Sequence, residues 1–347
     1  MTALAQILTA RIMAQGPMPL SDYMAECLLH PQHGYYTTRP PFGVEGDFTT
    51  APEISQMFGE LLGLCLAQAW LDQGAPVPFT LAEVGPGRGT LMADILRATR
   101  AVPGFHGGMR LRLVEASPRL RALQAQTLQG YAPEWVQIAD LQGPLYLVAN
   151  EFFDALPIRQ FQRSGAAWRE RLVGLGPDGL TLGLGPVLPV PELTHRLTDT
   201  TEGQIVETCP QAPAIAAQIA ARLIPGLALI LDYGGWHSLG DTFQALRAHA
   251  PVDPFATPGE ADLTAHVDFE PLTGACAHAY TTQGALLTAL GIEARSARLA
   301  QRLTGAALQS HLAATRRLTS PAEMGTLFKV LALFPHGAPQ PPGFPDA

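Results

Sequence analysis

The sequence has few of the features that mark metal, disulfide or nucleic-acid proteins. Its four cysteines, Cys27, Cys65, Cys209 and Cys276, are scattered, with no Cys-x-x-Cys pair and no histidine at ligand spacing. This pattern favours neither a structural zinc nor a disulfide framework, and it fits a reducing compartment. Lys329 is the only lysine, no basic run is present, and the net charge is −8. Nucleic acids are bound through clustered Lys and Arg, so we expect no nucleic-acid partner.

Long hydrophobic runs and targeting segments are also missing. The longest apolar runs, such as residues 227–231, are far shorter than the ~18 residues that a membrane-spanning helix needs. The N-terminus shows no charged segment followed by a hydrophobic stretch and a cleavage site, so no secretory signal is expected. Hydrophobic residues make up 47% of the chain and charged residues 15%, which indicates a globular protein with thick apolar layers. We therefore expect a cytoplasmic enzyme without membrane insertion.

The most informative stretch runs from Phe79 to Thr90 and reads F-T-L-A-E-V-G-P-G-R-G-T. A short apolar run containing Glu83 leads into three alternating glycines, Gly85, Gly87 and Gly89, and helical spacing follows. Strand, glycine turn and helix form the first unit of a nucleotide-binding α/β sheet. In that unit, glycines let a ligand approach the backbone, and the helix N-terminus offers free N–H groups.

This loop distinguishes between kinds of ligand. Its glycines do not follow the dinucleotide pattern G-x-G-x-x-G, and Glu83 would repel a pyrophosphate. A P-loop is excluded because no Gly-Lys-Ser/Thr follows. S-adenosylmethionine suits the loop better, because a carboxylate attracts its sulfonium and ammonium in a partly dry site. We predict that Glu83, the three glycines and Thr90 bind this cofactor; the alternative is a plain turn with structural glycines.

Acidic residues follow the next two predicted strands. The strand at residues 111–114 ends in Glu115, at the place where doubly wound nucleotide folds put an acid on the ribose hydroxyls. We predict Glu115 as the ribose ligand. A third short strand at residues 135–138 precedes Asp140, which either contacts the adenine or is an exposed loop aspartate. No metal site is predicted.

A fourth strand, residues 145–149, leads directly into Asn150, Glu151 and Asp154. Ligands of open α/β sheets bind beyond the carboxyl ends of the strands, so we predict these three residues as catalytic. The alternative, an N-cap for a following helix, accounts for Asp154 but leaves Asn150 and Glu151 as unpaired polar groups.

The rest of the chain is expected to surround this domain. Residues 1–75 are predicted as N-terminal helices and a lid, with a capping box of Thr50 and Glu53 opening one long helix. The methyl-transfer region itself is assigned to residues 76–334, with insertions at about 158–206 and 236–285.

Three predictions concern the C-terminal third. His266 is either a substrate contact or, as we favour, a solvated histidine of a capped helix within residues 262–269. Residues 292–299 and 326–334 are expected to supply the last strands. Residues 335–347 are expected to form a flexible Pro/Gly-rich tail with nothing to pack.

Several blocks of the sequence resemble the MidA-like methyltransferases, whose mitochondrial members assist assembly of respiratory complex I. The matching blocks are G-D-F-T-T-A-P-E-I-S-Q-M-F-G-E-L-L-G (46–63), E-V-G-P-G-R-G-T-L-M (83–92), N-E-F-F-D-A-L-P (150–157), L-D-Y-G (231–234), D-L-T-A-H-V-D-F (262–269) and M-G-T-L-F-K-V-L (324–331). The resemblance implies a class I S-adenosylmethionine-dependent fold. This is an α/β, Rossmann-like, doubly wound and mostly parallel seven-stranded sheet, here with an N-terminal helical and lid extension and insertions after strands 4 and 5.

The resemblance also implies an activity and further site residues. For the mitochondrial members it implies arginine methylation of a complex I subunit, and hence a protein substrate. It makes residues 46–56 part of the cofactor and substrate site, with Thr50 toward the cofactor and Asp47, Ser55 and Gln56 toward the substrate. Mitochondrial members begin with a presequence, whereas this chain starts at its first helix, which suits a bacterial-type cytoplasmic protein.

Two alternatives to this function stay open at the level of sequence. One is methylation of a different side chain or of a small molecule, and the other is an assembly chaperone that retains a cofactor pocket. The sequence leaves the oligomeric state open, a homodimer included.

Overall fold

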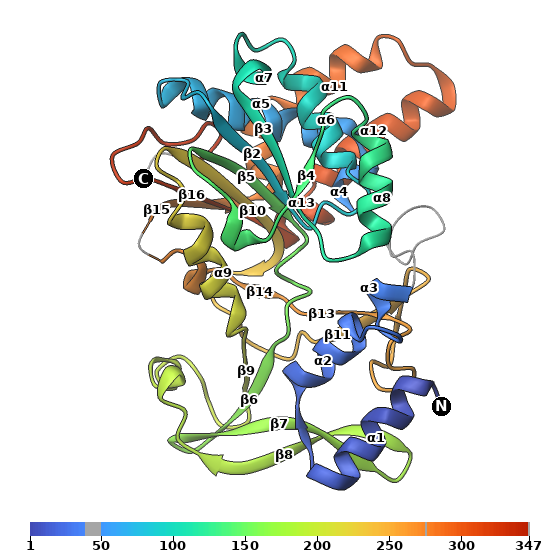
Figure 1. The fold of residues 1–347 in the computed structure, drawn as a ribbon. Coiled ribbons are helices and arrows are strands. Elements are labelled where there is room, and N and C mark those ends of the chain that lie inside the picture. Colours follow the sequence, from blue (N-terminus) through green and yellow to red (C-terminus); the bar gives the residue numbers. More distant parts are fainter. Residues whose placement is uncertain (39–49, 275, 346–347) are drawn as a thin grey trace. The chain divides into compact units, whose positions relative to one another are not determined.

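The computed structural model describes residues 1–38, 50–274 and 276–345. The chain divides into two compact units (Figure 1). Unit 1 comprises Met1–Phe48, Asp154–Ala212 and Gly235–Glu270, and unit 2 comprises Thr49–Phe153, Pro213–Gly234 and Pro271–Ala347. Each unit is therefore built from three separate stretches of the sequence.

Unit 2 contains the central sheet predicted from the sequence. Within the described residues its strands lie in the order β4-β3-β2-β5-β10-β16-β15. They are β2 (Phe79–Val84), β3 (Met109–Val114), β4 (Glu134–Trp135), β5 (Leu145–Asn150), β10 (Gly226–Gly235), β15 (Ala277–Thr282) and β16 (Phe328–Phe334). The pairs from β4 to β10 are parallel, and β16 runs antiparallel to both of its neighbours. This is the doubly wound, mostly parallel sheet expected.

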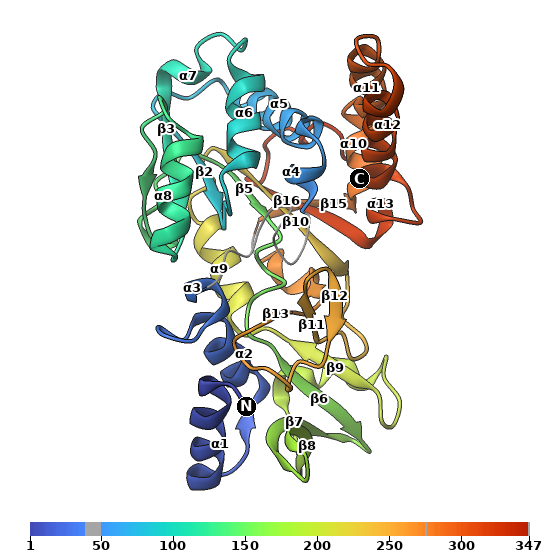
Figure 2. The same cartoon turned by 90° about the vertical axis from the view of Figure 1, so that its right-hand side faces the viewer.

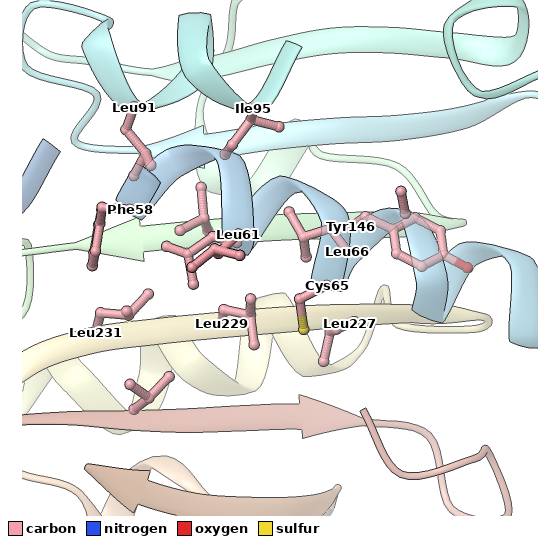
Figure 3. Close-up of a cluster of buried hydrophobic side chains, with 14 of the residues drawn as sticks. Phe58, Leu61, Cys65, Leu66, Leu91, Ile95, Tyr146, Leu227, Leu229 and Leu231 are labelled. Carbon is pink, nitrogen blue, oxygen red and sulfur yellow. The ribbon is translucent and has the colours of Figure 1, made fainter. Parts of the chain in front are cut away.

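Helices pack on this sheet through a continuous apolar core. The helices of unit 2 are α4 (Ala51–Ile54), α5 (Gln56–Asp72), α6 (Thr90–Thr99), α7 (Phe105–Gly108), α8 (Pro118–Thr127), α10 (Gln283–Ala289), α11 (Ile292–Ala300), α12 (Gly305–Thr319) and α13 (Met324–Leu327); α9 (Gln211–Ala220) begins at its boundary. Leu227, Leu229 and Leu231 are alternate residues of β10 and face α5, where Phe58 and Leu61 are buried (Figure 3). Each buried aliphatic side chain contributes about 1.5–3 kcal/mol, so this layer fixes α5 on the sheet.

Unit 1 is formed by short helices and antiparallel strands. Its helices are α1 (Ala3–Gln15), α2 (Leu20–Leu29) and α3 (Tyr35–Thr38). One sheet has the order β1-β7-β6-β9, with β8 paired to β7, and a second has the order β12-β11-β13. These strands are β1 (Met18–Pro19), β6 (Arg159–Ser164), β7 (Ala167–Gly176), β8 (Gly179–Leu188), β9 (Ile205–Thr208), β11 (Gln244–Arg247), β12 (Ala250–Val252) and β13 (Asp262–Thr264), and β14 (Val267–Asp268) follows. Among the described residues, no helix has the length and apolar character needed to cross a membrane.

The predicted capping box at Thr50 is wrong. The Thr50 side chain makes no capping hydrogen bond, and the helix is interrupted at Ser55, which has extended backbone angles. Ser55 then caps α5, because its Oγ accepts a hydrogen bond from the Met57 N–H at 3.3 Å. The Glu53 carboxylate is directed to other partners, since its Oε1 accepts a hydrogen bond from Thr90 and its Oε2 lies near Arg88.

Three further predictions for the C-terminal third are corrected. Residues 292–299 form α11 rather than a strand, and Ile292 and Ser296, one turn apart, are the buried face of that helix. Residues 262–269 form β13 and β14 rather than a helix, with Thr264 paired to Gln244 of β11. The C-terminal segment is packed at Phe344, which is only 8% exposed and belongs to the core of unit 2.

Candidate cofactor and active site

The glycine loop lies between β2 and α6. Gly85, Gly87 and Gly89 have φ values of 67°, 51° and 82°, in the left-handed region that favours glycine. At Gly85 space is restricted as well, because a Cβ there would lie 3.0 Å from the Phe152 ring. The loop therefore needs glycine for its backbone conformation and for the close approach of the chain after β5.

Glu83 is the acid of this motif and is buried on β2, with 2% of its surface exposed. Burial raises the pKa of Glu83 to about 8; a backbone hydrogen bond from Met92 opposes the shift, and the nearby Glu115 charge adds to it. Its Oε2 atom has no hydrogen-bond partner among the described residues. A buried carboxyl oxygen without a partner costs free energy that a neighbouring cation can offset. The residues present thus fit a positively charged cofactor.

Glu115 is held in place at the end of β3. Its Oε1 accepts the Ser117 N–H at 2.8 Å, and its Oε2 accepts a hydrogen bond from Gln124 at 3.2 Å. Burial raises the pKa of Glu115, although hydrogen bonds from Ser117 and Gln124 oppose the shift. The Ala116 N–H also hydrogen-bonds this carboxylate. Because a carboxylate offers about four acceptor positions, at least one stays available for a hydroxyl group of a ligand.

The loop after β5 is strained at Glu151, whose φ is 51°. A left-handed non-glycine residue costs of order 1–3 kcal/mol, and such strain gathers at functional sites. The Glu151 carboxylate accepts hydrogen bonds from the Ala51 N–H at 3.3 Å and from the Asn150 side chain at 3.1 Å. Asn150 and Glu151, both predicted from the sequence, are thus in direct contact beside α4.

Asp232 fixes the same loop and was not singled out by the sequence analysis. It is fully buried in β10, directly after Leu231, where the pairing of β10 with β5 ends. Its Oδ2 accepts the N–H groups of Phe152 at 3.2 Å and Phe153 at 3.0 Å, and its Oδ1 accepts that of Tyr233 at 3.0 Å. The signal in the sequence was the L-D-Y-G block, because the parallel pairing of β10 with β5 ends at its first residue, Leu231.

Helix α4 joins the loop after β5 to the glycine loop. Thr90 Oγ1 donates a 2.7 Å hydrogen bond to Glu53 Oε1, and Arg88 lies 3.6 Å from Glu53 Oε2. Since Ala51 in the same helix contacts Glu151, one short helix contacts both loops. The sequence analysis named Glu53 individually only as a capping residue, although it lies within the block at residues 46–56 that the resemblance places at the site.

The remaining predicted site residues of unit 2 differ in burial and in hydrogen bonding. Thr50 is buried at 9% exposure, and Asp140 is exposed at the end of the 3₁₀ helix η1 (Ile138–Asp140). Ser55 caps α5, and Gln56 donates a 3.2 Å hydrogen bond to Glu60. Ser55 and Gln56 therefore both stabilise the start of α5.

Three predicted residues fall outside unit 2. Asp154 and His266 belong to unit 1, where the Asp154 carbonyl accepts the Ala265 N–H at 3.0 Å. The His266 N–H donates to Thr242 Oγ1 at 2.8 Å. Asp47 lies outside the described residues. Within the described part of the chain, no cluster of three or more His, Cys, Asp or Glu residues is arranged to hold a metal.

The site thus combines a glycine loop and a buried acid with a second acid after β3 and a polar loop after β5. The part of the sequence that contains most of these features matches a known family. Residues 61–286 match the family described as "Putative S-adenosyl-L-methionine-dependent methyltransferase". The chain belongs to this family. Its cofactor is S-adenosylmethionine, and it is a methyltransferase, as the glycine loop and the resemblance predicted.

Relatives and a solved structure are similar to this chain over nearly its whole length. "Protein arginine methyltransferase NDUFAF7 homolog, mitochondrial" from Drosophila melanogaster is 37% identical, with 96% of this chain and 85% of that protein covered. "Protein arginine methyltransferase NDUFAF7, mitochondrial" from Homo sapiens is 34% identical, with 96% of this chain and 84% of that protein covered. A COG1565 superfamily member from Burkholderia thailandensis, solved with bound S-adenosyl-homocysteine, has a TM-score of 0.83 and 30% identity, covering 99% of this chain and 96% of that chain.

These similarities correct one expectation. The cytoplasmic location inferred from the sequence is wrong by this comparison, because the curated relatives are named as mitochondrial proteins. The inference had relied on the missing secretory signal and on the start of the chain at its first helix, and neither feature identifies a compartment. The predicted family, fold and cofactor are confirmed, and the relatives are named as protein arginine methyltransferases.

Proposed function

We propose that this methyltransferase methylates a guanidinium nitrogen of an arginine in a protein substrate. The relatives at 34–37% identity carry the name protein arginine methyltransferase, and the match covers 96% of this chain. A subunit of respiratory complex I is the partner that the family resemblance suggests. The observation that carries the proposal is Glu151, directly after β5, whose backbone has a left-handed φ and whose carboxylate is oriented by two hydrogen bonds.

Arginine demands such a carboxylate because it is a poor nucleophile, with a pKa above ~12. When bound, S-adenosylmethionine supplies a methyl group on a positively charged sulfur. Transfer of this methyl group would form an N–C bond and break the C–S bond, leaving S-adenosylhomocysteine, and the guanidinium would release one proton to a carboxylate or to solvent. A carboxylate that hydrogen-bonds the planar guanidinium can orient the reactive nitrogen and favour loss of that proton.

The main site residues of unit 2 then have proposed roles. Glu83 places negative charge near the cofactor's cationic groups, and the glycine loop allows close approach of its backbone. Glu115 holds the ribose, with Thr90 and Thr50 beside the loop. Glu151 orients the guanidinium, and Asn150 fixes Glu151 through its 3.1 Å hydrogen bond.

Other assignments rest on the sequence alone. They are Asp154 as a second catalytic acid, Asp140 as an adenine contact, and Asp47, Ser55, Gln56 and His266 as substrate contacts. They remain predictions, to be tested one variant at a time.

The test replaces Glu151 by glutamine, which keeps its shape and removes its charge. Affinity for S-adenosylhomocysteine, measured by calorimetry, should change less than about twofold, while methyl transfer should fall by ~100-fold, within the range for a catalytic acid or base. Transfer is measured with labelled cofactor, and mass spectrometry of candidate complex I subunits identifies the modified side chain. Glu134→Gln, which changes an exposed acid, is the control.

Two results would contradict the proposal. Full transfer by Glu151→Gln would remove Glu151 from the chemistry, and a label on any group other than arginine would change the substrate class. Asp154→Asn, assayed in the same way, tests the second predicted acid separately.

A further inference from the structure

Gln124 is buried with none of its surface exposed, on α8, within the region assigned to the cofactor. All the hydrogen-bonding groups of its amide are used. Nε2 donates to the Gly87 carbonyl at 2.8 Å and to Glu115 Oε2 at 3.2 Å, and Oε1 accepts the Trp135 indole N–H at 2.7 Å. One side chain therefore contacts the glycine loop, the acid after β3 and the strand β4.

This arrangement determines which way the amide faces. The Trp135 indole is only a donor, so it requires the oxygen of Gln124 on its side. The nitrogen must then face the Gly87 carbonyl and the Glu115 carboxylate, which are both acceptors. The amide orientation is thus set by three chemically different neighbours, and Gln124 can fix Glu115 relative to the glycine loop.

We infer that Gln124 is a positioning residue for the ribose of the cofactor. It acts through Glu115, whose Oε2 it holds by hydrogen bonding, while Ser117 holds Oε1. Without Gln124, Oε2 loses the hydrogen bond that holds it toward the ribose hydroxyls, while Oε1 stays bound to Ser117, and the Gly87 carbonyl loses its partner. This inference rests on the proposed role of Glu115 as the ribose ligand.

The test measures recognition of the ribose directly. Calorimetry gives the Kd of S-adenosylhomocysteine and of an analogue that lacks both ribose hydroxyls, for the wild type and for Gln124→Met, which has a similar shape and no amide. We expect the wild type to prefer the hydroxylated ligand at least tenfold, and Gln124→Met to lose at least threefold of that preference. A loosened glycine loop weakens both ligands alike, so the ratio isolates the effect on the ribose.

Three further variants make the result decisive. Gln126→Met changes an exposed glutamine of the same helix and should leave the ratio unchanged. Glu115→Gln should lower the ratio at least as much as Gln124→Met does. Trp135→Phe removes the donor to Gln124 Oε1 and should lower the ratio in the same direction, which supplies a second measurement if Gln124→Met does not fold.

The outcomes separate the inference from its premise. If Glu115→Gln lowers the ratio and neither Gln124→Met nor Trp135→Phe does, Glu115 binds the ribose without help from Gln124, and the inference is overturned. If Glu115→Gln leaves the ratio unchanged, the role of Glu115 fails and the inference fails with it.

Discussion

Glu83 is expected to make cofactor binding depend on pH. Burial raises its pKa to about 8, so in the free protein the carboxyl is mainly protonated at neutral pH. A cationic cofactor favours the carboxylate form, so binding should release a proton. Affinity for S-adenosylmethionine should therefore rise between about pH 6 and about pH 8 and then level off. Calorimetry in two buffers with different ionisation enthalpies measures the released proton.

The same residue should affect the stability of the free protein. The folded state keeps the Glu83 proton up to about pH 8, whereas an unfolded chain releases it near the ordinary value of 4.5. The folded state then binds more protons, so the contribution of Glu83 to the unfolding free energy falls as the pH rises through that interval. Glu83→Gln should remove both this contribution and the proton release on binding. If cofactor affinity and unfolding free energy depend on pH in this variant as they do in the wild type, Glu83 is not the titrating group.

Asp232 is expected to stabilise the loop that carries Glu151. Asp232→Ala leaves the N–H groups of Phe152 and Phe153 without their acceptor, at a cost of about 1–3 kcal/mol for each buried group. The free energy of unfolding in urea should fall by about 2–4 kcal/mol, and methyl transfer should decrease. Asp72→Ala, which changes an acid at the end of α5, should change stability by less than about 0.5 kcal/mol. Equal stability of Asp232→Ala and the wild type would show that the loop does not depend on this carboxylate.

At the scale of secondary-structure elements, α4 is the connection between the glycine loop and Glu151. Glu53→Ala removes the 2.7 Å hydrogen bond from Thr90 and the ion pair with Arg88. A hydrogen bond to a charged group contributes about 1.5–3 kcal/mol. We expect affinity for S-adenosylhomocysteine to fall about tenfold, and methyl transfer to fall further because Ala51 no longer holds Glu151 in place.

Thr90→Val separates the loss of the Thr90 hydrogen bond from the loss of the ion pair between Glu53 and Arg88. It removes the hydroxyl donor but keeps the carboxylate of Glu53, so its effect should be smaller than that of Glu53→Ala and in the same direction. If cofactor affinity is unchanged in both variants, α4 does not support the glycine loop.

Elements could be predicted where their signal is local. The turn from β2 to α6 was predicted because three glycines with positive φ reflect a backbone requirement at those positions. The break between α4 and α5 was missed because Glu53 pairs with Thr90, which is far away in the sequence. Helix α11 was taken for a strand because a short mixed segment does not distinguish the two periodicities, and its contacts with α12 and α5 decide the outcome.

At the scale of the whole molecule, Glu60 connects distant parts of unit 2. Its buried carboxylate accepts hydrogen bonds from Arg97 of α6 at 3.0 Å and from Arg295 of α11 at 2.8 and 3.0 Å. Figure 2 shows α5 next to α6, with the C-terminal helices α10 to α12 grouped together. Burial raises the pKa of Glu60, but the arginine hydrogen bonds outweigh burial and leave the pKa below its ordinary value.

Glu60→Gln should therefore destabilise the protein by about 2 kcal/mol, the scale of hydrogen bonds to charged groups. Because the folded pKa is lowered, the stabilisation by Glu60 is complete above the ordinary value of 4.5 and is lost as the pH falls through the folded value. Urea unfolding at neutral and acidic pH should show a difference from the wild type that shrinks in acid. A difference independent of pH would point to lost packing instead of lost charge.

The sequence by itself determined the cofactor class and the doubly wound sheet, and it predicted as site residues the acid within β2 and the acids that follow β3 and β5. These features depend on residues that are neighbours in the chain, namely a glycine pattern and polar residues at strand ends. Only the tertiary structure decided the roles of Glu53, Glu60, Gln124 and Asp232. Their partners are distant in the sequence, and a side chain finds such a partner only after helices have packed on the sheet.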